Sequence, residues 1–250
     1  MHRFNSAGVE IAYETAGEGE PILLIHGFAS SGRVNWWDTG WVKTLTEAGH
    51  KVVTFDNRGH GASQKLYDPE AYPAPEMAED ARRLLDHLGI AKADVMGYSM
   101  GARIAAFLTI NHPDRVRRAV FAGLASRMIT GVGGGDAIAT GLDAESLADV
   151  TEPTARAFRT FAEQTGSDLK ALAACMRSSR AKITAEALSR ISVPVLVVAG
   201  EKDDVAGSVD GLVSVIPGAK GVTLPSRNHM NAVGDKGYKA AVLDFLTSQR

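Results

Sequence analysis

Short runs of branched apolar residues, each bounded by turn residues, recur along most of the chain. Such runs predict buried strands, because a strand covered on both faces is apolar at every position. Residues 9–15 alternate instead and lead into a turn at 17–21, which indicates an antiparallel edge hairpin with the stretch before them. The further predicted strands are 21–25, 51–55, 93–97, 116–122, 194–199 and 221–224.

Helical patterns lie between these strands. Residues 75–88 place apolar side chains on one stripe, with acidic residues early and basic residues late, as the helix dipole favours. Residues 100–110 are almost all apolar and predict a buried helix. Two further helices are predicted at 41–48, which ends at a C-capping Gly49, and at 238–246. Strands that alternate with helices predict an α/β fold with a doubly wound, mostly parallel sheet.

The stretch 126–192 breaks this alternation. It contains no convincing strand and consists of a glycine run followed by short helical segments such as 153–164 and 169–177. Connections of this length are uncommon within a compact domain, and many of them are lids over a site. We therefore expect a core formed by residues 1–125 and 193–250, with 126–192 inserted as a helical cap. The alternative is a set of ordinary surface helices.

Composition and charge narrow the classes of function. The 27 Lys and Arg residues nearly balance the 29 Asp and Glu residues, so the surface as a whole is not of the basic kind that binds nucleic acid. Residues 1–8 have no apolar signal segment, and no apolar run approaches the ~20 residues of a membrane helix. The single cysteine, Cys175, fits a small buried side chain better than a catalytic thiol. We expect a cytoplasmic protein with a small-molecule partner and neither nucleic acid nor membrane as a partner.

The run Gly97-Tyr98-Ser99-Met100-Gly101 fits the pattern G-x-S-x-G. The pattern alone is weak in a chain with 26 glycines. Its position strengthens it, because it follows a predicted strand and opens a buried helix, as a nucleophile elbow requires. Glycines on either side allow close approach of neighbouring backbone, and the helix N-terminus favours developing negative charge. We therefore predict that Ser99 is a nucleophile.

A serine hydroxyl needs a base to take its proton, and a carboxylate must then orient that base. His229 follows the last predicted strand, at the sheet edge where active crevices lie. The strand 194–199 leads into Glu201-Lys202-Asp203-Asp204, where one acid should point toward His229. The other histidines lie at predicted helix ends, in glycine-flanked turns or near residue 1, which favours structural roles: His2, His26, His50, His60, His87 and His112.

Four segments together resemble the α/β-hydrolase superfamily, from about residue 9 to the end of the chain. They are His26-Gly27-Phe28, the run 56–63, the elbow around Ser99, and Gly200-Glu201-Lys202-Asp203 with the late His229. The chain order of serine, acid and histidine is also the order of that family.

The resemblance implies a role for further residues. In the family the acid lies three residues after the glycine that ends its strand, which selects Asp203 over Asp204. The resemblance implies an oxyanion hole formed by the backbone N–H groups of Phe28 and Met100. It implies scaffold roles for His26 and for the turn at His60.

The activity implied is that of a serine hydrolase that cleaves a carboxylic ester, or a similar acyl substrate, through an acyl-enzyme intermediate. No cofactor and no metal are expected, since the chain has no H-E-x-x-H motif, no paired cysteines and no P-loop. Serine at the elbow argues against dehalogenase- and epoxide-hydrolase-like activities, whose members carry aspartate there. A lactonase, a perhydrolase or a C–C bond hydrolase would use the same triad.

Two alternatives are more distant. The run Tyr98–Arg103 resembles the elbow of menaquinone-pathway synthases, whose matching arginine binds an anionic substrate, although a salt-bridged or surface Arg103 explains it more simply. The fold also includes non-catalytic ligand-binding proteins, but an intact triad favours catalysis.

Aromatic and methionine side chains suggest an apolar acyl pocket. Packing in the core or the lid would explain most of these side chains, so we expect only two or three of them to touch the substrate. The predicted lining residues are Trp36, Trp37, Met128, Phe158 and Phe161. The oligomeric state is left open.

Overall fold

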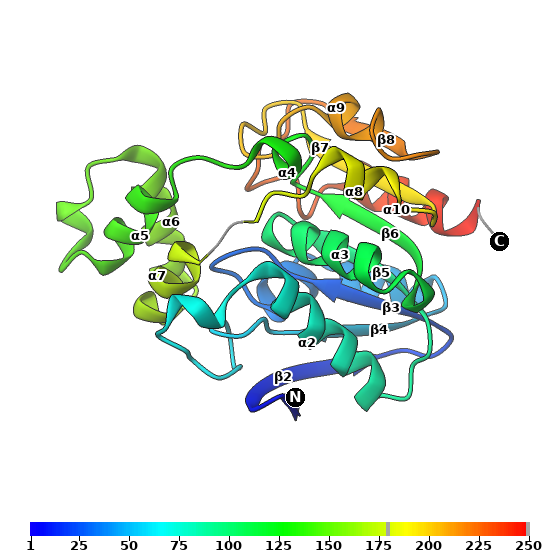
Figure 1. The fold of residues 1–250 in the computed structure, drawn as a ribbon, viewed down its shortest axis with the longest axis horizontal. Coiled ribbons are helices and arrows are strands. Elements are labelled where there is room, and N and C mark those ends of the chain that lie inside the picture. Colours follow the sequence, from blue (N-terminus) through cyan, green and yellow to red (C-terminus); the bar gives the residue numbers. More distant parts are fainter. Residues whose placement is uncertain (179–180, 249–250) are drawn as a thin grey trace.

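A mixed sheet forms the centre of the computed structural model, which describes residues 1–178 and 181–248 (Figure 1). The strands in these residues are β1 (His2–Ser6), β2 (Val9–Ala16), β3 (Glu20–Ile25), β4 (His50–Phe55), β5 (Ala93–Tyr98), β6 (Val116–Ala122), β7 (Val195–Gly200) and β8 (Lys220–Leu224). They form one sheet in the order β1-β2-β4-β3-β5-β6-β7-β8. β2 is antiparallel to both β1 and β4, and all other neighbours are parallel.

Helices cover both faces of this sheet. They are α1 (Trp41–Glu47), α2 (Ala74–His87), α3 (Met100–Asn111), α9 (Val209–Val213) and α10 (Lys236–Thr247). In β3, Leu23 and Ile25 belong to one apolar cluster with side chains of α2, α3 and α9. Ile22 and Leu24 belong to a second cluster with side chains of α1 and α10. Because neighbouring residues of a strand face opposite sides, two buried faces require the continuous apolar runs seen in the sequence.

The predicted fold class is confirmed. Each strand predicted from the sequence is present, with ends that differ by no more than one residue, and the preceding hairpin partner of 9–15 is β1. The predicted helices at 153–164 and 169–177 coincide with α6 (Pro153–Gln164) and α7 (Leu169–Arg177). Residue Gly49 follows α1 with a φ of 82°, as a C-capping glycine does.

Within the described part of the stretch 126–192, the longest helix that the sequence patterns did not locate is α5 (Gly135–Asp143). It begins with a glycine and contains Gly141, and both residues are poor helix formers. Gly141 lies where an added Cβ would approach Val150 and Ala155 to about 3.0 and 3.1 Å, so tight packing of neighbouring segments favours this glycine. Tertiary packing therefore overrides the local preference.

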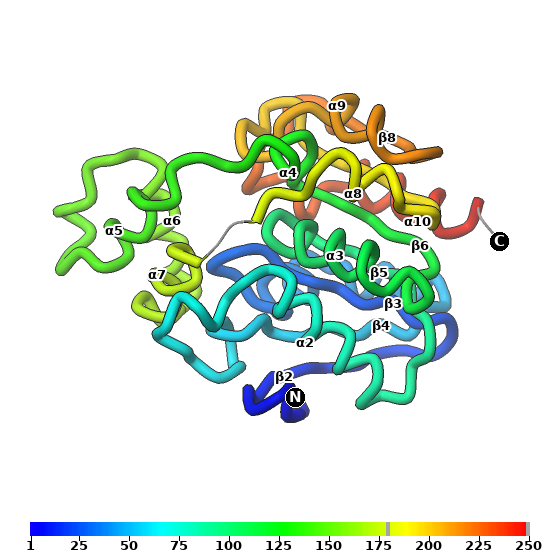
Figure 2. Tube along the Cα trace, in the orientation of Figure 1, coloured from blue at the N-terminus to red at the C-terminus, as the bar shows by residue number. Residues whose placement is uncertain are grey.

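Helices α5, α6 and α7 lie together at one end of the molecule, at the left of Figures 1 and 2. They share an apolar cluster of their own, which includes Ile138, Ala162 and Leu172. By contrast, α4 (Arg127–Thr130) and α8 (Ala185–Ser189) contribute Met128 and Leu188 to the cluster that packs on the sheet face covered by α2, α3 and α9. The division into a core and a 126–192 cap stays a prediction, and these clusters suggest where its ends would lie.

The helices formed by residues 1–178 and 181–248 are all too short or too polar to cross a membrane.

Candidate active site

Ser99 stands at the sharp turn between β5 and α3. Its backbone has φ 55° and ψ −115°, a left-handed conformation that costs a non-glycine residue about 1–3 kcal/mol. The Ser99 N–H donates to the carbonyl of Ala122 in β6 over 2.7 Å, which ties the turn to the next strand. The Ser99 side chain is half-buried and lines a cavity. The strained turn thus presents the hydroxyl to a site that a substrate can enter.

Two glycines make this turn possible. A Cβ on Gly97 would lie 2.1 Å from the carbonyl oxygen of Gly101. A Cβ on Gly101 would lie 2.0 Å from the carbonyl oxygen of Ile25 in β3. Both distances are far below a normal contact, so the spacing of the motif reflects how closely α3 crosses β5 and β3.

His229 connects Ser99 to a carboxylate. Its Nε2 lies 2.9 Å from the Ser99 Oγ, and its Nδ1 lies 2.9 Å from Oδ2 of Asp203. Asp203 is 6% exposed, and its Oδ1 accepts hydrogen bonds from the N–H groups of Val205 and Ala206. The structure therefore brings together the three residues that the sequence nominated. It also places Asp203 rather than the exposed Asp204 beside the histidine.

Tyr98 fixes the loop that carries His229, and sequence reasoning missed this role. Its hydroxyl donates to the backbone carbonyl of His229 over 2.5 Å, and the two rings lie 5.5 Å apart. Tyr98 is 5% exposed, and burial raises the pKa of its phenol well above the ordinary value. The phenol therefore stays protonated and remains a hydrogen-bond donor. The only sequence signal for this role of Tyr98 is its position inside the G-x-S-x-G motif.

The two predicted oxyanion donors flank Ser99. Met100 is the first residue of α3, and Phe28 lies in the turn after β3, where Ala29 has a φ of 58°. That turn is held by Asn35, whose Oδ1 accepts from the Gly27 N–H over 3.0 Å. Within the described residues, neither the Phe28 nor the Met100 N–H has an acceptor in the protein. Both donors are thus available to a substrate oxygen.

His26 and His60 lie behind this turn. The His26 Nε2 accepts from the Asn57 N–H over 2.9 Å, and its Nδ1 lies 2.7 Å from the Gly27 carbonyl. Burial lowers the pKa of His26 to about 4 and that of His60 to about 3. Both rings are fully enclosed and neutral at ordinary pH. Their position agrees with the scaffold role that the resemblance implies.

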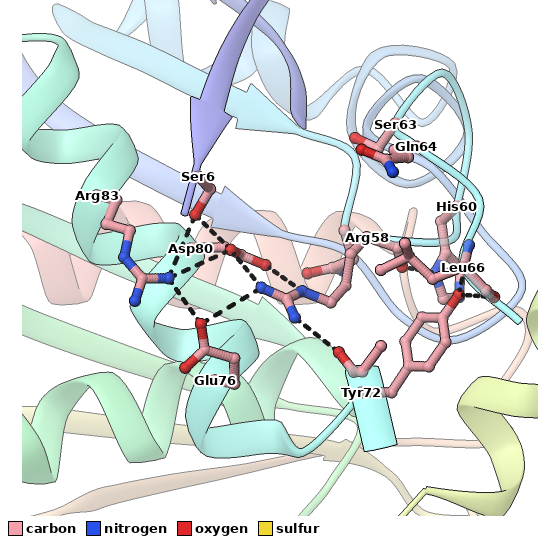
Figure 3. A network of polar contacts seen from close by, with 12 residues as sticks. Ser6, Arg58, His60, Ser63, Gln64, Leu66, Tyr72, Glu76, Asp80 and Arg83 are labelled. Carbon is pink, nitrogen blue, oxygen red and sulfur yellow. Dashed lines mark hydrogen bonds and ion pairs between the residues drawn. The ribbon is translucent and has the colours of Figure 1, made fainter. Parts of the chain in front are cut away.

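A buried ion pair between Arg58 and Asp80 holds the segment that carries Tyr72 (Figure 3). Arg58 donates twice to Asp80 of α2, over 2.7 and 2.8 Å, and once to the Ala71 carbonyl over 2.7 Å. Glu76, Arg83 and Ser6 extend this network. Because the network pins the segment before α2, it fixes Tyr72, whose hydroxyl donates to the Leu66 carbonyl.

Two cavities meet at Ser99, with volumes of about 220 Å³ and about 370 Å³. Phe28, Ser99 and Phe158 line both of them. Phe28 and Phe158 pack edge to face, with their ring centres 5.8 Å apart, so an α6 side chain stands over the nucleophile. The site thus lies between the sheet and the helices α5 to α7.

The predicted pocket residues divide into two groups. Phe158 and Phe161 of α6 line the smaller cavity. Trp36, Trp37 and Met128 line neither cavity. Trp36 is fully buried edge to face with Trp41, and Trp37 packs against the same apolar cluster, on the sheet face covered by α1 and α10. Met128 is fully buried in the cluster on the other face. The pocket prediction is corrected for these three, because core packing takes their side chains.

Arg103 lies one turn along α3 from Ser99. It is 6% exposed, its Nη1 donates to the Ala181 carbonyl over 2.9 Å, and it lines the larger cavity. It is therefore a buried residue and not a surface arginine.

No group of three or more His, Cys, Asp or Glu side chains suited to hold a metal occurs in residues 1–178 and 181–248.

Comparisons with known proteins place this geometry in context. Residues 20–131 match the family model described as the alpha/beta hydrolase fold. The 3-oxoadipate enol-lactonase 2 of Acinetobacter baylyi is 29% identical over 217 residues, which are 81% of this chain and 79% of that enzyme. Among solved structures, a hydrolase from Pseudomonas aeruginosa PA01 has 27% identity and a TM-score of 0.83, over 98% of each chain.

A further relative matches a shorter segment. A Mycobacterium tuberculosis protein, provisionally named non-heme bromoperoxidase BpoC, is 36% identical over 120 residues. The match covers 48% of this chain and 44% of that protein, so the chain spans less than half the length of this relative.

Proposed function

We propose that this chain, which belongs to the α/β-hydrolase superfamily, is a serine hydrolase that cleaves a small carboxylic ester, or a similar acyl substrate, through an acyl-enzyme intermediate. The observation that supports this most is the continuous hydrogen-bonded chain from Asp203 through His229 to Ser99, which ends in a cavity. A binding protein would have no need for the strained Ser99 conformation or for two unused N–H donors beside it.

The first half of the reaction forms the acyl-enzyme. Asp203 at Nδ1 favours the tautomer that leaves Nε2 of His229 free to accept a proton. As Nε2 takes the hydroxyl proton, the Ser99 Oγ attacks the substrate carbonyl carbon. Negative charge then develops on the carbonyl oxygen, where the N–H groups of Phe28 and Met100 would stabilise it. The intermediate collapses when His229 returns the proton to the leaving oxygen, and the alcohol departs.

The second half releases the acid. A water molecule enters where the alcohol left, and His229 takes its proton while the oxygen attacks the acyl carbon. The Ser99 Oγ is then the leaving group and receives the proton from Nε2. Each proton removed is returned within the cycle, so the reaction needs no metal or redox group.

The test is ester hydrolysis by purified protein, with p-nitrophenyl acetate and butyrate as substrates. Ser99→Ala should lower kcat by about 10³-fold or more, because it removes the nucleophile and leaves the fold intact. Labelling by a fluorophosphonate should disappear in parallel, while the melting temperature should stay near that of the parent. A variant that keeps more than a tenth of the parent kcat would contradict the proposal.

A lactonase is the second candidate, and it is favoured by the similarity to the A. baylyi enol-lactonase over 81% of this chain. The same residues would open a cyclic ester, with the leaving oxygen still tied to the acyl group. Comparing kcat/KM for a set of lactones and open-chain esters of equal carbon number separates the two. A preference of tenfold or more for lactones would replace the ester assignment.

A further inference from the structure

The two cavities beside Ser99 do not offer the same chemistry. His229 lines the smaller one and is absent from the residues that line the larger one. Met100, one of the two oxyanion donors, lines the larger one only. Phe28, Ser99 and Phe158 lie where the two meet. The substituents of a substrate carbon bonded to Ser99 could therefore extend into either of two different cavities.

The transfer of a proton from His229 to the leaving oxygen decides which substituent enters which cavity. The proton taken from Ser99 resides on Nε2 of His229, 2.9 Å from the Oγ. That proton must reach the leaving oxygen, so the leaving oxygen has to come within hydrogen-bond distance of Nε2. The group attached to the leaving oxygen then extends into the space that His229 lines, which is the smaller cavity of about 220 Å³.

The remaining substituent of the tetrahedral carbon is the acyl group. With the oxyanion directed at the N–H groups of Phe28 and Met100, the acyl group points away from His229. The space on that side is the larger cavity of about 370 Å³. Most residues around it are apolar, including Tyr72, Leu124, Ile138 and Met176, whereas the charged residues of its lining are Arg103, Arg127 and Asp204.

On this basis we propose a fixed substrate orientation, which rests on the serine hydrolase function proposed above. The larger cavity binds the acyl group and the smaller cavity binds the leaving alcohol. The substrate class is then an ester of an apolar, multi-carbon acid with a short alcohol. The acyl group is enclosed by α5, α6 and α7, because Ile138, Phe158 and Met176 belong to these helices.

Two half-buried valines provide a matched pair of probes. Val132 lines the larger cavity, and Val233 lines the smaller one. The same substitution, Val→Phe, adds a side chain of equal volume to each cavity. The backbone carbonyl of Val233 accepts from the Trp41 Nε1 over 2.6 Å, and a side-chain change keeps this bond. Each variant therefore serves as the control for the other.

The experiment measures kcat/KM for two ester series with the parent and both variants. One series holds the alcohol as methyl and lengthens the acyl chain from two to ten carbons. The other holds the acyl group as acetyl and lengthens the alcohol in the same way. Val132→Phe should lower kcat/KM for the longest acyl chains about tenfold relative to acetate and should leave the ranking of alcohols as in the parent. Val233→Phe should do the reverse.

Each outcome is decisive. If Val132→Phe changes the alcohol series and Val233→Phe changes the acyl series, the orientation is inverted and the proposal fails. If both variants change both series equally, the two cavities do not bind the acyl and alcohol groups separately, and the proposal also fails. A parent protein that cleaves neither series defeats the ester hydrolase function itself. Fluorophosphonate labelling of Ser99 and a cooperative melt show that each variant is folded, and a structure with an octylphosphonate on Ser99 should hold the alkyl chain in the larger cavity.

Discussion

Tyr98 shows how one residue of the elbow can hold two distant segments of the site together. It precedes the nucleophile in sequence, and its phenol reaches the backbone of His229, 131 residues away. The loop around His229 is largely exposed, so it has few apolar contacts to keep it in place. The partly buried hydrogen bond from Tyr98 would therefore limit how far the base can move from Ser99.

Tyr98→Phe tests this role. Removing one hydrogen bond costs about 0.5–1.5 kcal/mol, so we expect kcat to fall by up to about tenfold with little change in KM. The rate of fluorophosphonate labelling should fall by the same factor, because it also depends on His229.

Tyr238→Phe is the matched control. The Tyr238 hydroxyl is buried near Tyr98 and has no hydrogen-bond partner within residues 1–178 and 181–248. Its loss should leave kcat within about twofold of the parent. Equal kcat values for Tyr98→Phe and the parent would show that the bond does not position His229.

The choice of acid is a second prediction at this scale. Asp203→Asn should lower kcat by about 10³–10⁴-fold, since an amide favours the wrong histidine tautomer. Asp204→Asn should keep most of the activity, because Asp204 is exposed and the Nδ1 of His229 is hydrogen-bonded to Asp203. Steady-state kinetics of the two variants give the ranking, and a reversed ranking would assign the acid to Asp204.

At the scale of elements, the stretch that contains α5, α6 and α7 begins and ends at neighbouring points of the chain. The chain leaves through α4 and re-enters before α8, and the Ile183 N–H donates to the Met128 carbonyl over 3.2 Å. The two ends of the intervening stretch therefore lie close together in the core. The helices α5, α6 and α7 have their own apolar cluster. These contacts suggest that the stretch can be removed without opening the sheet.

A capless variant tests this arrangement. Replacing residues 131–181 with a short glycine–serine linker should give a protein that melts cooperatively and still reacts at Ser99 with a small fluorophosphonate. It should lose the parent's ranking of acyl chain lengths, since Phe158 and Met176 are gone from the cavity walls. Circular dichroism melts and the methyl ester series provide the measurements. Dye-binding protein without a cooperative melt would show that the cap belongs to the core.

At the scale of the whole molecule, two buried histidines connect stability to pH. The folded protein lowers the pKa of His26 to about 4 and that of His60 to about 3 through burial, while an unfolded histidine has a pKa near 6.5. Between these values the unfolded chain binds protons that the folded chain does not. Their stabilising effect is thus complete above pH 6.5 and is lost as the pH falls toward 4 and below.

Urea unfolding at a series of pH values measures this effect. Two protons taken up on unfolding correspond to a slope of up to about 2.7 kcal/mol per pH unit between pH 4 and 6. His60→Gln should remove about half of that slope. His2→Gln is the control, because His2 is exposed, and it should leave the slope unchanged. A parent-like slope in His60→Gln would rule out His60 as a source.

The sequence by itself was enough to predict the α/β class, the strand positions and the candidate site residues Ser99, Asp203 and His229. These are local signals, because apolar runs, turn residues and a motif between a strand and a helix are each read within a few neighbouring positions. The position of His229 after the last strand pointed to the base, while the choice of Asp203 over Asp204 came from the resemblance to the α/β-hydrolase superfamily.

Only the tertiary structure decided which side chains line the cavities and which pack in the core. An aromatic residue has the same apolar character in either place, so Trp36 and Phe158 could not be told apart until the sheet and the α5–α7 helices were positioned. The Tyr98 bond to His229 and the two cavities beside Ser99 likewise depend on segments more than a hundred residues apart. No local pattern records such contacts, because they arise from the packing of the whole chain.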